Sequence, residues 1–402
     1  YTVDASCGDN QGAVYVGQAT VTAGSWSLSG SFDNSKFYVA TVTDVTNGIS
    51  EFSTSETQQA FVTTWSTTDG EITIPTKSFE TYNYDISWTN LTNPGTMEGT
   101  ANVTIDTDYT ITPVESGSTY RVEITGTFPA IQFNNNPTDR VKILTVQQWG
   151  DISWTSFSNA FYGCSNLSIT AVDAPDLSGV TDMSSAFQSA TSFNESIEHW
   201  DVSGVENFSG MFWGANTFNQ PLDGWTVTAA LDMSNMFRDA DAFNQDLNSW
   251  VPSLVTTMKS MFYSANAFNG AIGNWDVSSV LDMQTMFFLA GEFNQPLAGW
   301  GITTGSVANM SSMFRGAVKF DQPINAWDVS SVITMASMFD NAAMFNQDLN
   351  SWVTTSLQNL SITFKDAVLF NGQIDNWDVS SVTSFQQMFE GALLFNQSLN
   401  NW

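Results

Sequence analysis

The residue types that most often perform catalysis are scarce in this chain and are not grouped. His199 is the only histidine, and it lies beside Trp200 in a connecting segment. A Ser-His-Asp mechanism needs the imidazole held against a nucleophile and an orienting acid, and nothing near His199 suggests that arrangement. A single histidine excludes a histidine-rich metal site, and no Gly-rich phosphate loop is present. The sequence therefore predicts a protein that is not an enzyme and has no resident cofactor.

Carboxylates are the abundant charged groups. Asp and Glu number 40 against 10 Lys and Arg, which gives a formal net charge of -30. Nucleic acid and anionic membranes are disfavoured as partners, because phosphate binding needs clustered cations. The two interpretations of the acids are a soluble, self-repelling surface and calcium binding by grouped Asp. Paired carboxylates for glycoside hydrolysis stay open in principle, although acids that recur with a repeat are typical of a surface.

One set of aspartates recurs mostly two repeats apart. These are Asp201, Asp276, Asp328 and Asp378. With coils about 4.8 Å apart, they would be separated by about 10 Å, too far to share an ion whose ligands lie within about 2.6 Å. We therefore predict that each forms a local Asx turn.

The cysteines and the chain ends say little about location. Cys7 and Cys164 allow at most one disulfide, and Cys164 lies where a small buried side chain is expected. No apolar run reaches the roughly 18 residues of a membrane span. The chain starts at Tyr1 and stops at Trp402, between two repeats, so we expect it to be part of a longer protein.

The strongest signal is a repeat that runs from about residue 177 to the last residue. Tryptophans recur every 25 residues, with one step of 27. A repeat of this length cannot bury its apolar face alone, so the repeats must stack. The predicted core of the stack consists of Trp200, Trp225, Trp250, Trp275, Trp300, Trp327, Trp352, Trp377, Phe212, Phe237, Phe262, Phe287, Phe314 and Phe339.

Each repeat has two segments with different apolar patterns. Between Leu231 and Ala240 the apolar spacing is three to four, which predicts a short helix or 3-10 turn. The Phe-Asn-x-x-Leu/Ile-x-x-Trp segment is predicted to be extended and to form the sheet side. Four serines precede the predicted helices and are candidate N-caps; they are Ser203, Ser278, Ser330 and Ser380.

Asparagine follows a phenylalanine in eight of nine repeats, with Asp321 in the ninth. A stacked Asn can donate to one coil and accept from the next, which predicts an internal ladder; a sugar-binding row is the alternative. The tryptophans allow the same choice between core and sugar stacking. The predicted ladder consists of Asn194, Asn219, Asn244, Asn269, Asn294, Asn346, Asn371 and Asn396.

Before the repeats, the pattern alternates with a period of two and is rich in Val, Thr and aromatic residues, which is typical of β-strands. We predict a β module over residues 1-57, a second β-sandwich over 58-138, and the stack over 139-402. Its first repeat, at about 141-176, departs from the pattern, as expected of a cap.

Several segments resemble known families. The words Trp-Asp-Val-Ser-x-Val-x-x-Met-x-x-Met-Phe-x-x-Ala-x-x-Phe-Asn-Gln resemble the repeat of BspA-like leucine-rich-repeat surface proteins, and residues 160-167 resemble a related repeat of that group. Residues 33-53 are similar to the end of an immunoglobulin-like module. Gly117, Tyr120 and Val122 approximate the final strand of a PKD-like domain, although its Trp-x-x-Gly-Asp-Gly turn is absent.

These resemblances imply a mixed fold, a leucine-rich-repeat-like solenoid of parallel strands and short helical turns preceded by two immunoglobulin-like sandwiches. They imply a secreted cell-surface protein of the kind found in Bacteroidota and exported by the type IX route, with a role in cell adhesion. The expected partner is a protein or glycan on another cell or surface. The alternative is a stalk, surface-layer or fibre-forming protein that associates with itself. A glycan-active enzyme is the third and least favoured hypothesis.

Overall fold

The computed structural model describes residues 41-44, 49-52 and 58-402, and the chain forms two compact units, 1-58 and 59-402. In the first unit, strands β1 (Thr41–Asp44) and β2 (Ile49–Phe52) pair antiparallel. The other strands expected over residues 1-57 lie outside the described residues. The immunoglobulin-like interpretation of this segment therefore stays a prediction.

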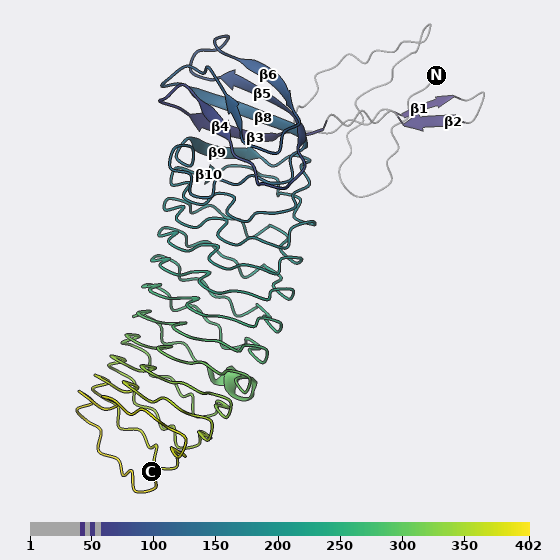
Figure 1. The fold of residues 1–402 in the computed structure, drawn as a ribbon. Coiled ribbons are helices and arrows are strands. Elements are labelled where there is room, and N and C mark those ends of the chain that lie inside the picture. Colours follow the sequence, from purple (N-terminus) through teal and green to yellow (C-terminus); the bar gives the residue numbers. More distant parts are fainter. Residues whose placement is uncertain (1–40, 45–48, 53–57) are drawn as a thin grey trace. The chain divides into compact units, whose positions relative to one another are not determined.

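The second unit begins with a six-stranded mixed sheet (Figure 1), in the order β10-β9-β3-β8-β5-β6. A second sheet has two strands, β4 and β7. In the chain order, these two strands lie between strands of the six-stranded sheet. The strands are β3 (Phe61–Ser66), β4 (Ile72–Ile74), β5 (Asn83–Asn90), β6 (Gly99–Val103), β7 (Tyr109–Ile111), β8 (Thr119–Thr127), β9 (Ile143–Gln148) and β10 (Ser168–Ile169).

The six-stranded sheet extends into the first coil, where β10 is its edge strand. Strand β3 pairs antiparallel with both β8 and β9, and β9 pairs parallel with β10 in the first coil. Phe61 of β3 packs against Trp149 and Trp154, with ring centroids 5.6 and 5.1 Å apart. A Cβ on Gly150 would lie 2.4 Å from the Ala60 carbonyl oxygen, so only glycine permits this approach. Residues 59-138 therefore share a sheet with β9 and β10 and one apolar core with the repeats.

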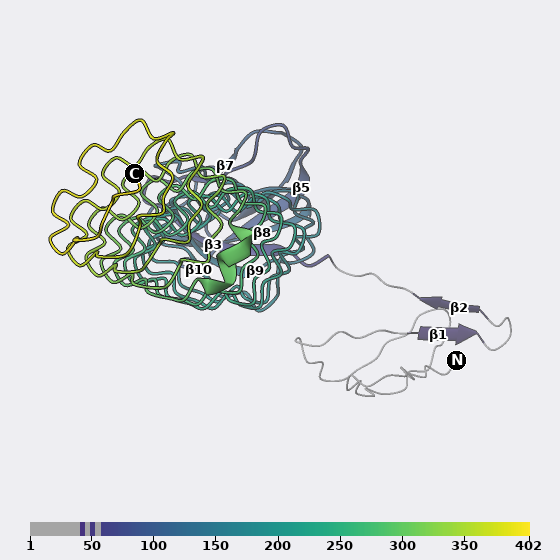
Figure 2. The same cartoon turned by 90° about the horizontal axis from the view of Figure 1, so that it is seen from below.

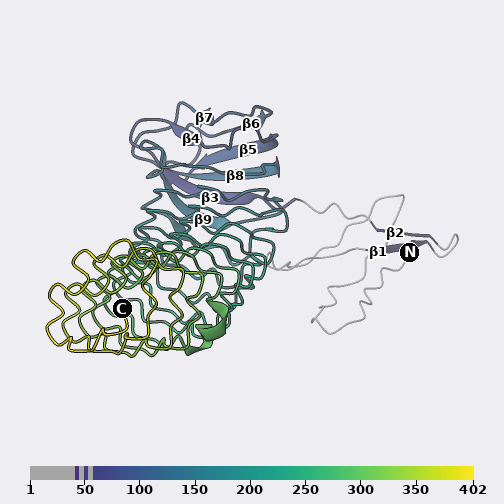
Figure 3. The same cartoon turned by 60° about the horizontal axis from the view of Figure 1, so that its bottom comes forward.

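From about residue 153 the chain winds into what we call the coil stack (Figures 1 and 3). One residue of each coil forms a parallel bridge with the next, in the series Asp182, Asn207, Asp232, Thr257, Asp282, Asn309, Thr334, Asn359 and Ser384. In the seven residues that follow a bridge residue, every second backbone N–H donates to a carbonyl of the next coil. For example, the N–H of Phe187 donates to the carbonyl of Met211. We call this surface the ladder face; it consists of residues 182-189, 207-214, 232-239, 257-264, 282-289, 309-316, 334-341, 359-366 and 384-391.

The predicted helices are wrong. Among the described residues there is no α-helix, and the one helical element is the 3-10 helix η1 (Ala298–Thr303), in the coil with two extra residues. Nothing helical in the described part of the chain is long and apolar enough to cross a membrane. The fold is thus not the mixed leucine-rich-repeat solenoid that the sequence suggested.

The apolar spacing of three to four has a different cause. Met236 donates its N–H to the Met233 carbonyl, and Ala240 donates to Phe237, so each segment is a series of turns closed over three residues. Between these turns, Asn235 and Asp239 take left-handed φ values of 57° and 53°. A left-handed residue every four positions prevents a continuous helix, while the turns still direct apolar side chains inward at helical spacing.

The prediction of which segment of each repeat forms the sheet side is also wrong. The Phe-Asn-x-x-Leu/Ile-x-x-Trp segments contain no strand, and the inter-coil bridges lie on the ladder face instead. We call these segments, residues 193-200 and their equivalents in each coil, the tryptophan side.

The distance between equivalent rings of adjacent coils differs around the coil. The ring centroids of Phe212 and Phe237 are 5.5 Å apart, whereas those of Trp225 and Trp250 are 6.5 Å apart. Figure 2, which views the stack along its length, shows successive coils displaced from one another.

Candidate functional site

The tryptophans of the repeat lie inside the coil stack. From Trp200 to Trp377 they are at most 3% exposed, and the six predicted core phenylalanines are fully buried. The indole Nε1 of each tryptophan from Trp225 to Trp402 donates to a backbone carbonyl of the preceding coil, at 2.7 to 3.3 Å. Their rings are therefore not available to stack on a sugar, and each joins two coils.

The asparagines form a second column, on the tryptophan side. The Oδ1 of Asn194 accepts the backbone N–H of Asn219 at 2.8 Å, and the same bond repeats in every following coil at 2.7 to 3.0 Å. In the coil where Asp321 replaces the asparagine, its carboxylate oxygen accepts the backbone N–H of Asn346. Each side-chain oxygen thus satisfies a backbone donor that no strand pairing would satisfy.

The recurring aspartates each close a local turn. The Oδ1 of Asp201 accepts the N–H of Ser203 at 3.0 Å, and Asp276, Asp328 and Asp378 do the same with Ser278, Ser330 and Ser380. The candidate N-cap serines therefore cap no helix and are the donors of these turns. Hydrogen bonds from the serine hydroxyl and N–H lower the pKa of Asp201, Asp328 and Asp378.

The remaining chemically active side chains are isolated. His199 is exposed, and Cys164 is buried, which raises the pKa of its thiol well above the usual value. Within the described residues, no three His, Cys, Asp or Glu side chains are grouped in a way that could hold a metal ion.

A column of outward-facing, mostly half-buried side chains on the ladder face was not predicted from the sequence. It is formed by the residue that follows the buried phenylalanine of each coil, and we call it the outer column. It consists of Trp213, Arg238, Tyr263, Phe288, Arg315, Asp340, Lys365 and Glu390. These positions differ in residue type from coil to coil, so a search for constant positions passes over them.

The first half of the outer column is a stack of aromatic rings and arginines. The guanidinium of Arg238 lies 4.7 Å from the Trp213 ring centroid and 4.2 Å from that of Tyr263. Tyr263 stacks on Phe288 at 4.5 Å, and Arg315 lies 5.5 Å beyond Phe288. Cation–π contacts of this kind hold both partners in place.

The second half is ionic. Arg315 Nε lies 2.9 Å from Asp340 Oδ2, and Lys365 Nζ lies 2.9 Å from Glu390 Oε1. Burial raises the pKa of Asp340, although Arg315 opposes the shift. Three of the five Lys and Arg in residues 155-402 belong to this column; the five are Arg238, Lys259, Arg315, Lys319 and Lys365. In a strongly acidic chain, the column is therefore where cations and partly exposed aromatic rings coincide.

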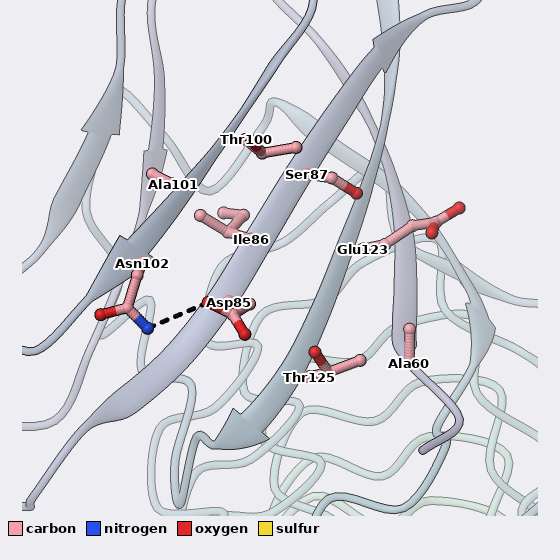
Figure 4. A pocket seen from close by; sticks show the side chains of 9 residues that line it. All are labelled: Ala60, Asp85, Ile86, Ser87, Thr100, Ala101, Asn102, Glu123 and Thr125. Carbon is pink, nitrogen blue, oxygen red and sulfur yellow. Dashed lines mark hydrogen bonds between the residues drawn. The ribbon is translucent and has the colours of Figure 1, made fainter. Parts of the chain in front are cut away.

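Another candidate site is a hollow on the solvent face of the six-stranded sheet, across β5, β6 and β8 (Figure 4). It has a volume of about 540 Å³ and a mainly polar lining that includes Ser87, Thr100 and Thr125. Asn102 Nδ2 donates to Asp85 Oδ1 at 2.9 Å, so these two side chains satisfy each other. The hollow lacks the aromatic and cationic groups of the outer column, which is the stronger candidate.

Comparison with known families gives one result. The family described as "Mycoplasma protein of unknown function, DUF285" matches three consecutive stretches, residues 155-258, 248-305 and 301-402. These stretches include every regular coil and more than half of the chain. No curated protein and no solved structure matches the chain. The resemblance to BspA-like leucine-rich-repeat proteins is therefore wrong, because similar apolar spacing arises in any repeat whose coils must stack.

Proposed function

The chain belongs to this DUF285 family, and we propose that it is a non-enzymatic adhesin or interaction module of the cell surface that binds a protein or glycan partner through its outer column. The observation that supports the proposal is the partly exposed series of aromatic and arginine side chains on the ladder face. Tryptophan, tyrosine and arginine dominate the binding energy of protein interfaces. A stack of repeats also presents an extended surface that one coil alone could not provide.

The shape of the column supports binding as well. Trp213, Tyr263 and Phe288 are half-buried, so they are held by their neighbours before a partner arrives. A partner then loses less free energy in ordering the surface, which is the general advantage of preorganisation. Their exposed parts lie in line along the stack, so contacts made to several coils add together.

A structural role without a separate ligand is the second candidate. The tryptophan and asparagine series join each coil to the next throughout the repeats, which suits a stalk or a fibre. Electron microscopy and size-exclusion chromatography separate the two roles, since a fibre former polymerises as its concentration rises and an adhesin stays single.

The binding proposal is tested with the whole chain on panels of glycans and extracellular proteins. We expect the variant with Trp213, Tyr263 and Phe288 replaced by Ser to lose the partner that the native chain retains. The matched control has Ser in place of Leu231, Leu281 and Ile333, which are exposed apolar residues outside the ladder face. This control variant should still bind the partner. Equal loss in both variants would contradict the assignment of the outer column.

The extracellular location is part of the proposal, because an adhesin must meet its partner outside the cell. It is tested by treating intact source cells with protease and identifying the released peptides. Peptides from residues 200-402 should appear before lysis. Their release only after lysis would make the coil stack an internal scaffold and sink the adhesin proposal.

A further inference from the structure

A groove crosses the outer column where its aromatic half meets its ionic half. We call it the column groove; it has a volume of about 570 Å³ and spans four coils. One part of its lining is apolar and another is charged. It is lined by Phe288, Leu289, Arg315, Gly316, Asp340, Asn341, Ile362, Lys365 and Asp366.

Two apolar residues of the groove occupy strained backbone positions. Leu289 and Ile362 have φ values of 57° and 62°, a region that branched side chains rarely adopt. Leu289 is 44% exposed, so its strain is not offset by full burial. The positions equivalent to Leu289 in other coils carry small or polar residues, namely Ser189, Gly214, Asp239, Ser264, Gly316, Asn341, Asp366 and Gly391. The left-handed backbone itself recurs in the other coils, so Leu289 and Ile362 differ from their equivalents only in carrying large apolar side chains there. Unfavourable side chains kept at strained positions are typical of functional sites.

The aromatic ring of the groove cannot serve as a platform for a sugar. One face of Phe288 is covered by the Tyr263 ring, 4.5 Å away and nearly parallel at 8°. The Arg315 guanidinium approaches the same ring at 5.5 Å from the next coil. A sugar stacks on an open aromatic face, and this ring offers its edge. The methyl groups of Leu289 and Ile362 instead suit an apolar side chain.

Arg315 supplies the polar part of the groove. Its Nε faces the buried carboxylate of Asp340, which holds the guanidinium in place. Within the part of the chain that the structure describes, no hydrogen bond engages its two terminal Nη groups. A guanidinium offers these donors in a geometry that fits a carboxylate with two parallel bonds.

We propose that the column groove binds an extended segment of a partner protein in which one carboxylate lies between apolar side chains. Arg315 holds the carboxylate, and Phe288, Leu289 and Ile362 receive the apolar groups. Because the chain carries a net charge of -30, a segment rich in acids would be repelled, which favours a single carboxylate. This inference rests on the proposed function and narrows its partner from protein or glycan to protein.

The test measures binding of labelled peptides to the whole chain by fluorescence anisotropy. The probe is an eight-residue peptide of Ser with one Glu between two Leu. Its matched controls have Gln in place of Glu, or Ser in place of both Leu. A hexamer of galacturonate tests an acidic glycan. We expect the Leu-Glu-Leu peptide to bind with a Kd on the order of 0.1 mM, at least tenfold more tightly than either control peptide or the glycan.

Variants of the chain then locate the site. Arg315→Gln should weaken peptide binding at least tenfold, and Arg315→Lys less. Ile362→Ser should weaken it several-fold while leaving the melting temperature equal or higher, since it relieves backbone strain. Lys259→Gln, on the same face outside the groove, should leave binding unchanged.

Four outcomes with the peptides and the variants would overturn the inference. They are no peptide binding at concentrations about tenfold above the expected Kd, equal binding of the three peptides, an unchanged Kd in Arg315→Gln, and a change in Lys259→Gln as large as that in Arg315→Gln. Preferential binding of galacturonate, lost in Arg315→Gln, would overturn this inference and leave the proposed function standing. If the partner panels and every probe fail, the proposed function falls as well.

Discussion

The ladder face and the tryptophan side join adjacent coils by different kinds of hydrogen bond. On the ladder face, backbone groups of adjacent coils bond to each other, which leaves the outward side chains free to differ. On the tryptophan side, most of the inter-coil bonds are made by side chains, chiefly those of Trp and Asn. Those residue types are then required in each coil. The constant positions of this repeat therefore report stacking, and its variable positions report what the surface can bind.

The largest effect should come from removing one tryptophan of the inner column. Trp275→Ala removes a buried ring and its bond to the Leu247 carbonyl, at 2.7 Å. We expect a loss of about 3 to 5 kcal/mol in the free energy of unfolding, measured by urea denaturation. Trp213→Ala in the outer column is the control and should cost far less. Equal costs would remove the distinction between the two regions.

The asparagine series should show a smaller and more specific effect. Asn269→Ala leaves the part-buried N–H of Asn294 without its acceptor, which should cost about 1 to 3 kcal/mol. Asn269→Asp keeps an acceptor, as Asp321 does naturally, and should retain most of the stability in urea denaturation. If both variants lose the same amount, the column works by packing rather than by hydrogen bonding.

Stability should depend least on the outer column. Arg238→Ala removes the contacts with Trp213 and Tyr263, which should cost about 0.5 to 1 kcal/mol. The same variant should lower affinity for a partner that contacts the first half of the column. A cost near that of Trp275→Ala in the same denaturation experiment would mean that the column is a structural element and not a binding surface.

Two aspartates, Asp328 just after the tryptophan side and Asp340 on the ladder face, should also respond oppositely to acid. Turn hydrogen bonds lower the pKa of Asp328, so its stabilisation is present above the ordinary Asp pKa and is lost as the pH falls through the folded-state value. Burial raises the pKa of Asp340, so its protonation favours folding as the pH falls toward the ordinary value.

These signs can be measured in urea between pH 6 and pH 3. Asp328→Asn should reduce the loss of stability on acidification, and Asp340→Asn should increase it, each by a small amount. Changes of the same sign in both variants would show that the environments of the two aspartates do not differ in the way that the contacts indicate.

Local patterns predicted some elements better than others. The stretches around Ile86 and Val122 alternate between inward and outward side chains, and strands β5 and β8 lie there. Leu231 to Ala240 shows helical spacing but forms turns, because the spacing of apolar residues does not reveal that Asn235 and Asp239 are left-handed. The outer column escaped notice because residues 25 positions apart, such as Tyr263 and Phe288, become neighbours only when the coils stack.

The sequence by itself determined that the coils must stack, since the apolar face of each 25-residue repeat can be buried only by its neighbours. It also determined which residues recur along the stack, including the Trp and Asn series. Only the tertiary structure decided which segment forms the backbone ladder and that the strands of residues 59-138 share a sheet with β9 and β10. Those outcomes depend on hydrogen bonds between residues far apart in the chain, and periodicity carries no information about which backbone groups will meet.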